Sequence, residues 1–294
     1  GSATSVQCRD CGYLAQCPRC STPFTFHAPS FLLCHQCNRR TSSPTHCPDC
    51  GSGRIRYLGV GTQRVAEEVS GAFPGARILR WDRDTSQGRG SHEAILAAFL
   101  RHDADVLVGT QMLAKGLHLP LVSLVGVVNA DVGLHLPDFR AGEGTFQILT
   151  QVAGRAGRSF FPGRAYIQTY NPDHYALRGV ADQTYEAFYD EEIAFRRALG
   201  YPPFSRLVRL LYADPSFAGA RRQAVRLFER LRQEIAVQGL PELEVIGPAP
   251  AYYQRVRGRY RWHLLLKGRD PARLLADFPL PEGWIVDVDP VNLL

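Results

Sequence analysis

Eight cysteines lie in the first 50 residues, and they form four Cys-x-x-Cys pairs. A two-residue gap lets a tight turn direct both sulfurs at one metal ion, and a closed tetrahedron of four thiolates is the usual coordination of structural Zn²⁺. Such a site has no open position for catalysis. The spacing therefore predicts two structural zinc ions, with ligands drawn from Cys8, Cys11, Cys17, Cys20, Cys34, Cys37, Cys47 and Cys50.

The gaps between the pairs favour one assignment of ligands. Thirteen residues separate Cys20 from Cys34, the length of a complete zinc ribbon. This leaves Cys8/Cys11 and Cys47/Cys50 as an outer site, with the ribbon nested inside it. A cross-braced pairing, first with third and second with fourth, is the alternative. Disulfides and an iron–sulfur cluster also compete, but short repeated spacing without a secretory leader favours zinc. We expect His27, His35 and His46 to be bystanders.

Composition indicates a globular protein rather than a membrane protein. The 294 residues suggest two domains plus a small metal module, and the formal net charge of +6 mildly favours a nucleic-acid partner. No apolar run approaches the length of a membrane span. Free thiols for metal binding imply a reducing cytoplasm. Gly1-Ser2 resembles the remnant of a cleaved tag, so we expect a longer natural N-terminus.

The elements that position these residues follow from periodicity. Short apolar runs alternate with helical patterns up to about Tyr170, which predicts a parallel sheet covered on both faces. After that point the order β-α-β-β-α-β indicates a ferredoxin-like α+β domain. The expected strands are 55–58, 78–81, 106–108, 124–128, 165–169, 206–212, 243–246, 260–266 and 284–288. The expected helices are 62–73, 92–101, 145–153, 182–199, 217–237 and 271–278, with a polar loop at 84–90 and a helix break at 200–203.

Two loops in the first part could meet phosphate. The run Gln151–Arg158 carries a helix into a Gly-Arg-x-Gly-Arg turn, and Arg155 and Arg158 could neutralise a transferring phosphoryl group as arginine fingers. Thr110, Gln111 and Lys115 follow a buried strand, where α/β sheets place ligands, and could hold a nucleotide or nucleic-acid backbone. A solvated basic turn and a plain strand-to-helix connection are the structural alternatives.

A second basic segment, residues 252–267, contains no acid. In an extended chain its four arginines share one face, and Tyr253, with the same parity, is a candidate for stacking on bases. Val256, Tyr260 and Trp262 would then face the core. The arginines are Arg255, Arg257, Arg259 and Arg261. We expect Asp287 and Asp289, and the arginines at 221, 222, 226, 230 and 232, to be ordinary solvated surface.

The chain resembles the PriA family of bacterial primosomal replication-restart proteins, which are superfamily 2 DNA helicases. The resemblance covers residues 8–290. It rests on the cysteine pairs and on the motifs Gly109–Gly116, Asp138–Arg140, Gln151–Arg158, Arg259–Trp262 and Asp287–Pro290. It implies a second RecA-like helicase lobe with an inserted two-zinc module in nested pairing, then a C-terminal domain that contacts single-stranded DNA. Implied partners are single-stranded and branched DNA, primosome proteins and single-stranded-DNA-binding proteins.

The resemblance also implies segment boundaries: a lead-in at 1–7, the zinc module at 8–50, the helicase lobe at 51–178, a helical linker at 179–203 and the C-terminal domain at 204–294. The chain has no Gly-x-x-x-x-Gly-Lys-[Ser/Thr] loop, so ATP and Mg²⁺ require an intact first lobe. Gln63, Asn129 and Gly144 depart from the family's usual charged residues.

Three functions remain open at this point. The first is a DNA-binding scaffold for replication restart. The second is the rear part of an active ATP-dependent 3′–5′ helicase. The third is an RNA-binding zinc-ribbon protein, which the length of the resemblance disfavours.

Overall fold

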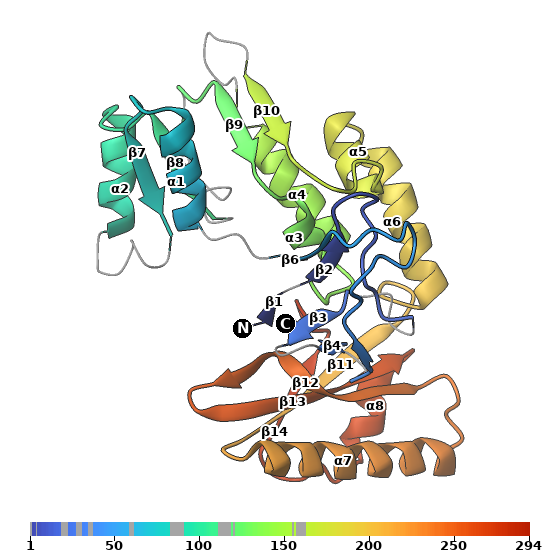
Figure 1. Cartoon of the computed structure of the whole chain (residues 1–294). Helices are drawn as coiled ribbons and strands as arrows, with labels where there is room; N and C mark the ends of the chain where they lie inside the picture. Colours follow the sequence, from blue (N-terminus) through green and yellow to red (C-terminus); the bar gives the residue numbers. More distant parts are fainter. Residues whose placement is uncertain are drawn as a thin grey trace. The chain divides into compact units, whose positions relative to one another are not determined.

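The computed structural model describes residues 2–3, 5–18, 23–27, 31–34, 38–58, 62–82, 91–110, 119, 121–154, 156 and 163–294 (Figure 1). These residues form two compact units. One comprises residues 1–58, 132–143 and 184–294, and the other comprises residues 59–131 and 144–183. The second unit is therefore interrupted by a short segment, 132–143, that packs within the first.

The second unit is built from parallel strands and helices. Strand β7 (Ile78–Trp81) pairs in parallel with β8 (Val106–Gly109), and β9 (Leu124–Val127) pairs in parallel with β10 (Arg164–Ile167). Helices α1 (Thr62–Ala72) and α2 (Ser91–Leu100) lie on opposite sides of the first pair (Figure 1). Most of α4 (Ala141–Ala153) and all of α5 (Tyr175–Ala181) also belong to this unit, whereas α3 (Asp131–Leu134) lies mostly in segment 132–143 of the first unit. The predicted parallel pairing is confirmed, but among the described residues the strands form two separate two-stranded sheets instead of the one parallel sheet expected.

One predicted member of that parallel series is wrong. Strand β6 (Ile55–Leu58) pairs antiparallel with β2 (Ser5–Cys8), so it closes the cysteine-rich module instead. Because Cys8 lies opposite Ile55 in this register, β2 and β6 bring together the two ends of the segment that contains the cysteines. Alternation of strands and helices predicts where a strand lies but not which strand it pairs with.

The cysteine-rich module has a small antiparallel sheet of its own. Its strands β1 (Ser2–Ala3), β3 (Thr25–His27), β4 (Phe31–Leu33) and β5 (Arg40–Ser42) lie in the order β1-β3-β4-β5. A compact core of Val6, Ala15, Phe24 and Leu32 packs with Cys17 and Cys34. So few apolar residues leave a module of this size dependent on a further stabilising element.

The helix predicted at 182–199 is shorter and starts later than expected. Helix α6 spans Tyr185–Leu199, and a left-handed Gln183 (φ 53°) separates it from α5. The ring of His174 caps α5 by accepting a hydrogen bond from the N–H of Ala176 at 3.2 Å. Helix α6 ends at Gly200 (φ 60°), as the Gly-Tyr-Pro-Pro run predicts.

The C-terminal part is an antiparallel sheet with the predicted element order. Strands β11 (Arg206–Asp214), β12 (Glu244–Val256), β13 (Arg259–Gly268) and β14 (Trp284–Val288) lie in the order β12-β13-β11-β14. Helix α7 (Phe217–Val237) follows β11, and α8 (Pro271–Ala276) precedes β14. This arrangement places β14 at one edge of the sheet.

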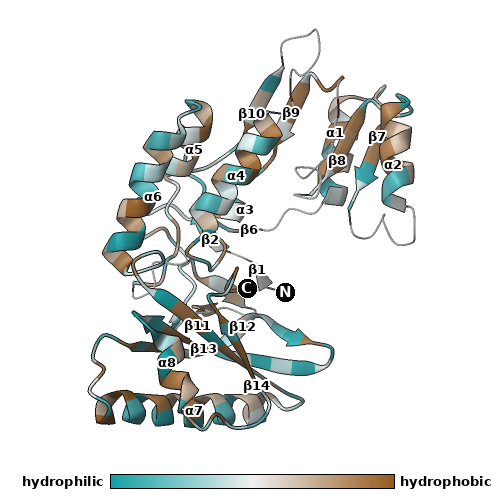
Figure 2. Ribbon diagram, turned by 180° about the vertical axis from the view of Figure 1, so that it is seen from behind, coloured by the Kyte–Doolittle hydropathy of each residue, from teal (hydrophilic) through white to brown (hydrophobic). Residues whose placement is uncertain are grey.

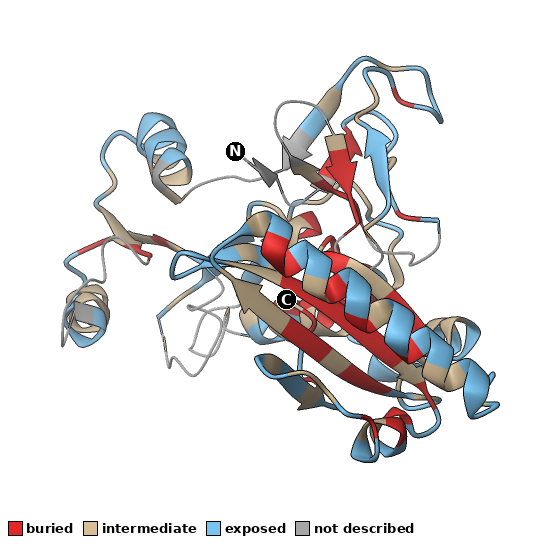
Figure 3. Ribbon diagram, turned by 90° about the horizontal axis from the view of Figure 1, so that it is seen from below, coloured by how far each residue is buried: buried red, intermediate tan, exposed pale blue. Residues whose placement is uncertain are grey.

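Helix α7 covers one face of this sheet (Figure 3). It packs there through an apolar stripe in which Ala220, Ala224, Leu227 and Leu231 are buried. Hydrophilic and hydrophobic residues alternate along the helix, as an amphipathic surface helix requires (Figure 2). The buried residues pack on side chains of β11 and β13 that point to the same face, namely Val208, Leu210, Trp262, Leu264 and Leu266.

The other face of the sheet is covered in part by segment 132–143. Phe139 stacks on Tyr201 with ring centroids 4.8 Å apart, and both pack with Leu207, Leu265 and other buried residues. The carboxylate of Asp138 accepts a hydrogen bond of 2.7 Å from the N–H of Leu293. A motif that precedes α4 therefore forms part of the C-terminal core.

Candidate metal centre and basic hairpin

Four cysteines from the two ends of the module converge. The sulfur atoms of Cys8, Cys11, Cys47 and Cys50 all lie within 4.8 Å of one another. The Cys8 and Cys50 sulfurs are 3.7 Å apart, and those of Cys11 and Cys47 are 3.5 Å apart. These separations suit four thiolates around one tetrahedral ion. The set is that of the outer site in the nested pairing.

Each pair lies on the same type of backbone turn. The N–H of Cys8 donates to the carbonyl of Tyr13 (2.8 Å), and the N–H of Gly12 donates to the carbonyl of Cys8 (3.2 Å). Cys47 makes the equivalent bonds with Ser52 (2.7 Å) and Gly51 (2.9 Å). Gly12 and Gly51 have φ of 77° and 73°, a conformation that glycine adopts without strain. The two turns thus explain why a glycine follows each pair.

The electrostatics of the cluster favour a cation. A backbone N–H of Cys11 directed at the Cys8 sulfur lowers the pKa of that thiol to about 7. The N–H of Tyr13 acts in the same direction on Cys11, but burial and the three neighbouring sulfurs raise the pKa of Cys11 to about 12. Four adjacent thiols cannot all ionise without a counter-charge, and a divalent ion supplies it.

The inner set of cysteines is described only in part. Cys17 and Cys34 are fully buried in the module core, whereas Cys20 and Cys37 lie outside the described residues. Cys34 nevertheless repeats the turn of the outer pairs. Its N–H donates to the carbonyl of Arg39 (2.9 Å), and the N–H of Asn38 donates to the carbonyl of Cys34 (2.9 Å). Asn38 has φ 63°, as Gly12 and Gly51 do in their turns.

The basic segment forms a β-hairpin, and this corrects the predicted faces. Arg255 lies opposite Tyr260, and Val256 lies opposite Arg259, so the turn is Arg257-Gly258. Both turn residues have positive φ (49° and 80°), which is the two-residue turn that suits a twisted hairpin. Opposed residues share a face, so Arg255 lies with Tyr260 and the other strand's arginines lie with Val256. The prediction of four arginines and Tyr253 on one face of an extended chain is wrong.

The arginines therefore point in several directions. The Arg255 guanidinium lies 5.1 Å from the centroid of the Tyr260 ring. Arg259 donates to the carbonyl of Ala213 at 3.0 Å, on the neighbouring strand. Burial, followed by the charge of Arg209, lowers the pKa of Arg261. Arg257 is exposed at the tip of the hairpin. The hairpin thus presents positive charge on both sides and at its tip.

The aromatic residues and Lys267 divide between core and surface. Trp262 is 1% exposed and Tyr260 packs edge-on against Phe217, so the prediction of a core role is confirmed for both. Val256 is 40% exposed and does not join them, because the turn places it on the other face. Tyr253 is exposed, as a stacking residue must be. Lys267 forms an ion pair of 3.2 Å with Glu244, and its side chain is largely buried.

The predicted nucleotide loops are described only at their starts. Thr110 is exposed immediately after β8. Helix α4 ends at Ala153, with the N–H of Gly154 bonded to the carbonyl of Thr150 at 2.9 Å. Gln111, Lys115, Arg155 and Arg158 lie outside the described residues.

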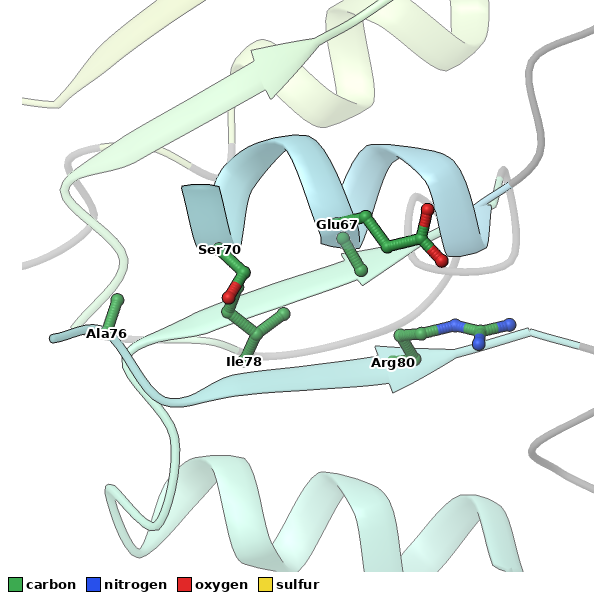
Figure 4. A pocket seen from close by; sticks show the side chains of 6 residues that line it. Glu67, Ser70, Ala76, Ile78 and Arg80 are labelled. Carbon is green, nitrogen blue, oxygen red and sulfur yellow. The ribbon is translucent and has the colours of Figure 1, made fainter. Parts of the chain in front are cut away.

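An open hollow lies between α1 and β7 (Figure 4). Glu67 and Ser70 of the helix and Ile78 and Arg80 of the strand line it. Arg80 also forms an ion pair of 2.6 Å with Asp82. None of the residues that line this hollow was expected from the sequence to form a site. We therefore assign no function to the hollow.

Sequence reasoning missed two buried polar clusters. Asp131 is fully buried and accepts hydrogen bonds from Tyr170 N–H (3.0 Å) and the side chains of Thr169 (3.1 Å) and Asn171 (2.9 Å). Arg196 bridges Glu143 (2.6 Å) and Glu192 (2.7 Å). Asp131 fixes the segment after β10, and Arg196 ties the start of α4 to α6. Their partners are distant in sequence, so no local motif indicates them.

No helix in the described part of the chain combines the length and apolarity needed to cross a membrane.

Two family models match separate parts of the chain. Residues 61–160 match the helicase conserved C-terminal domain, and residues 197–291 match the primosomal protein N C-terminal domain. The first range holds most of the parallel strands, and the second holds the antiparallel sheet with α7. The cysteine-rich module precedes both ranges.

Curated relatives match nearly the whole chain. The replication restart protein PriA of Bacillus subtilis is 43% identical over 277 residues, which is 94% of this chain and 34% of the relative. PriA of Synechocystis sp. is 43% identical over 311 residues (100% and 36%), and PriA of Treponema pallidum is 40% identical over 304 residues (100% and 46%). The chain thus spans between about a third and a half of these relatives. It belongs to the PriA family of replication restart proteins, as the counterpart of their C-terminal part.

Proposed function

We propose that this chain is the zinc-binding, DNA-contacting C-terminal part of a replication restart protein. In this role it binds single-stranded and branched DNA in the bacterial cytoplasm and supports the loading of primosome proteins. The observation that carries the proposal is the identity of 43% over 94% of the chain with a replication restart protein. The convergent cysteines and the acid-free segment 252–267 supply the chemistry for it.

Two zinc ions stabilise the cysteine-rich module. The outer ion is held by Cys8, Cys11, Cys47 and Cys50, whose sulfurs already lie within 4.8 Å of one another. The inner ion is held by Cys17, Cys20, Cys34 and Cys37. The turn of Cys34, which repeats the turns of the outer pairs, supports this second site. The ions compensate for the small apolar core, and closed Cys₄ sites give them a structural role.

The β12–β13 hairpin contacts the DNA backbone. Its sheet follows the ferredoxin-like arrangement, and the hairpin extends its edge. Arg255, Arg257 and Arg259 are exposed and can approach phosphates from both sides and from the tip. Burial, and then repulsion by Arg209, lowers the pKa of Arg261, and a phosphate beside the two arginines would offset that repulsion. Tyr253, 57% exposed, can stack on an unpaired base. Such contacts give affinity for single strands without sequence reading.

The parallel unit acts as the second RecA-like lobe of a helicase. Thr110, Gln111 and Lys115 meet nucleotide or DNA phosphate there. Arg155 and Arg158 act as arginine fingers only when a first lobe presents ATP and Mg²⁺. In the alternative proposal, the chain is the rear part of an active ATP-dependent 3′–5′ helicase. Gln63, Asn129 and Gly144 lack the charges usual in active relatives. A Cβ added at Gly144 meets no atom within 4 Å among the described residues.

Binding of a fluorescein-labelled oligothymidylate tests the DNA part, with anisotropy measured across a salt titration. The intact chain should bind. In a plot of log Kd against the logarithm of the salt concentration, each phosphate contact should add ~0.7 to the slope. Replacing Arg257 and Arg259 by alanine should weaken binding and flatten that slope. The matched control replaces Arg221 and Arg222 of α7, which should change neither. Equal binding by the hairpin variant at all salt concentrations would refute the assignment of the site.

A further inference from the structure

The edge strand β14 leaves its outer side without a partner strand in the described sheet. It pairs only with β11, at the end of the order β12-β13-β11-β14. Asp289 N–H donates to the carbonyl of Leu207 at 2.8 Å, directly beyond the last paired residues. Hydrogen-bonding groups alternate along an antiparallel strand. The N–H and C=O groups of Trp284, Val286 and Val288 therefore point to the free edge.

The side chains along this edge are apolar and accessible. Ile285 is 57% exposed on one face, and Val286 and Val288 are 42% and 50% exposed on the other. Val291 follows at 85%. Natural edge strands commonly discourage pairing with a lysine, a proline or a bulge. β14 (Trp284–Val288) has no lysine, proline or bulge, and its register with β11 is regular over all five residues; its one charged residue, Asp287, is paired with Arg209.

The charge around the edge is acidic. After Arg273 the chain has no lysine or arginine, and it contains Asp277, Glu282, Asp287 and Asp289. The carboxylate of Asp287 forms an ion pair of 3.2 Å with Arg209, and the charge of Asp289 interacts with that of Arg140. Glu282 is exposed two residues before β14 begins. Arg230 of α7 also reaches this segment, at the carbonyl of Pro279 (3.0 Å), so the negative charge at the edge is that of Glu282 and Asp289, which are exposed just beyond the two ends of β14.

We propose that β14 is a docking edge for an extended, basic and apolar segment of a partner protein. The segment adds a strand next to β14, bonds the outward groups of Val286 and Val288, and covers their side chains with alternate apolar residues. Basic residues at its ends meet Glu282 and Asp289. A second copy of this chain fits less well, because antiparallel self-pairing centred on Val286 places Glu282 of one copy beside Asp289 of the other.

Synthetic heptapeptides test this proposal with the whole chain. The probe is a fluorescein-labelled, end-blocked peptide RVTVTVR, and EVTVTVE is the acidic match with the same apolar residues. Anisotropy at 50 mM salt should show binding of the basic peptide at least tenfold tighter than that of the acidic one. Failure of the basic peptide to bind, or equal binding of the two, would overturn the proposal.

Substitutions locate the peptide. Val286→Pro removes an N–H that points outward and keeps the bonds to β11, so it should weaken the basic peptide at least tenfold. Val286→Thr keeps that N–H and should stay within threefold. Val237→Lys, at a valine 82% exposed at the end of α7, is the control and should change nothing. Unchanged binding by Val286→Pro would overturn the assignment.

Two further readouts remove ambiguity. Should Val286→Pro unfold the sheet, Glu282→Lys provides the second variant. It should weaken the basic peptide and strengthen the acidic one, and no change in either would contradict the charge argument. Sedimentation velocity should show the same mass for the parent and for Val286→Thr and Val286→Pro. A dimer of the parent that Val286→Pro dissociates would identify a second copy as the occupant and overturn the partner proposed here.

Discussion

Replacing Trp262 by alanine should destabilise the C-terminal sheet and leave the parallel unit unchanged. Trp262 is 1% exposed, lies edge-on to Phe217 with ring centroids 5.7 Å apart, and packs on Ala220 and Ala224 of α7. Removing a buried aromatic side chain costs ~3–5 kcal/mol because a cavity remains. At about 1.4 kcal/mol per tenfold change, even the lower limit raises the open population of the sheet by a factor of ~100.

Hydrogen exchange followed by mass spectrometry measures this effect locally. Amides of β11 and β13 that exchange by opening of the sheet should exchange ~100-fold faster or more, whereas those of β7 and β8 should keep their rates. Trp262→Phe should recover most of the protection, because the indole N–H has no hydrogen-bond partner among the described residues. Tyr253→Ala, at an exposed aromatic in β12, is the matched control. Unchanged exchange in Trp262→Ala would refute the placement of this residue in the core.

Four further predictions concern the cysteine-rich module, two glycines and catalysis. Chelation of metal should unfold residues 8–50, since structural zinc contributes on the order of 10 kcal/mol to the folding of such modules. The amides of β7 and β8 should stay protected from exchange. If the module and these strands unfold together, the two parts do not fold independently. Gly144→Ala should raise stability by ~0.5–1 kcal/mol, because α4 gains a better helix former in open space. Gly268→Ala should lower the stability, because the new Cβ would meet the Leu243 side chain and lie 2.8 Å from the Glu242 carbonyl oxygen. Thermal unfolding measures the effect of both glycine substitutions. The chain alone should show no DNA-stimulated ATPase, and turnover that persists through repurification would contradict this.

Local periodicity predicted most elements of the fold well. Helix α7 and strand β14 have the predicted ends, and α7 buries one apolar stripe along its length. These elements are long or strongly patterned, so their own residues specify them. The partner of β6 and the break at Gln183 were not predicted, because strand pairing and a left-handed residue of ordinary type depend on tertiary contacts.

In the candidate sites too, local sequence predicted some features, and others depended on tertiary contacts. The spacing of the cysteines groups Cys8, Cys11, Cys47 and Cys50, and the structure places their sulfurs together; zinc binding itself stays a prediction. The alternation of residues along the basic segment did not predict which side chains share a face, because the chain turns back at Arg257-Gly258. This turn lacks the Asn-Gly or Asp-Gly pair that would have indicated it in the sequence. The Asp138–Leu293 contact joins residues 155 apart, and no local pattern indicates it.

Zinc content measured by elemental analysis tests the central claim most directly. Freshly reduced parent protein should hold two zinc ions per chain. Cys8→Ser and Cys50→Ser should each reduce this to about one, and the double variant should lose no more than either alone, because the two sulfurs serve one ion. Cys17→Ser combined with Cys8→Ser should abolish binding. A parent with one ion or none, or additive losses in the Cys8/Cys50 double variant, would contradict the account.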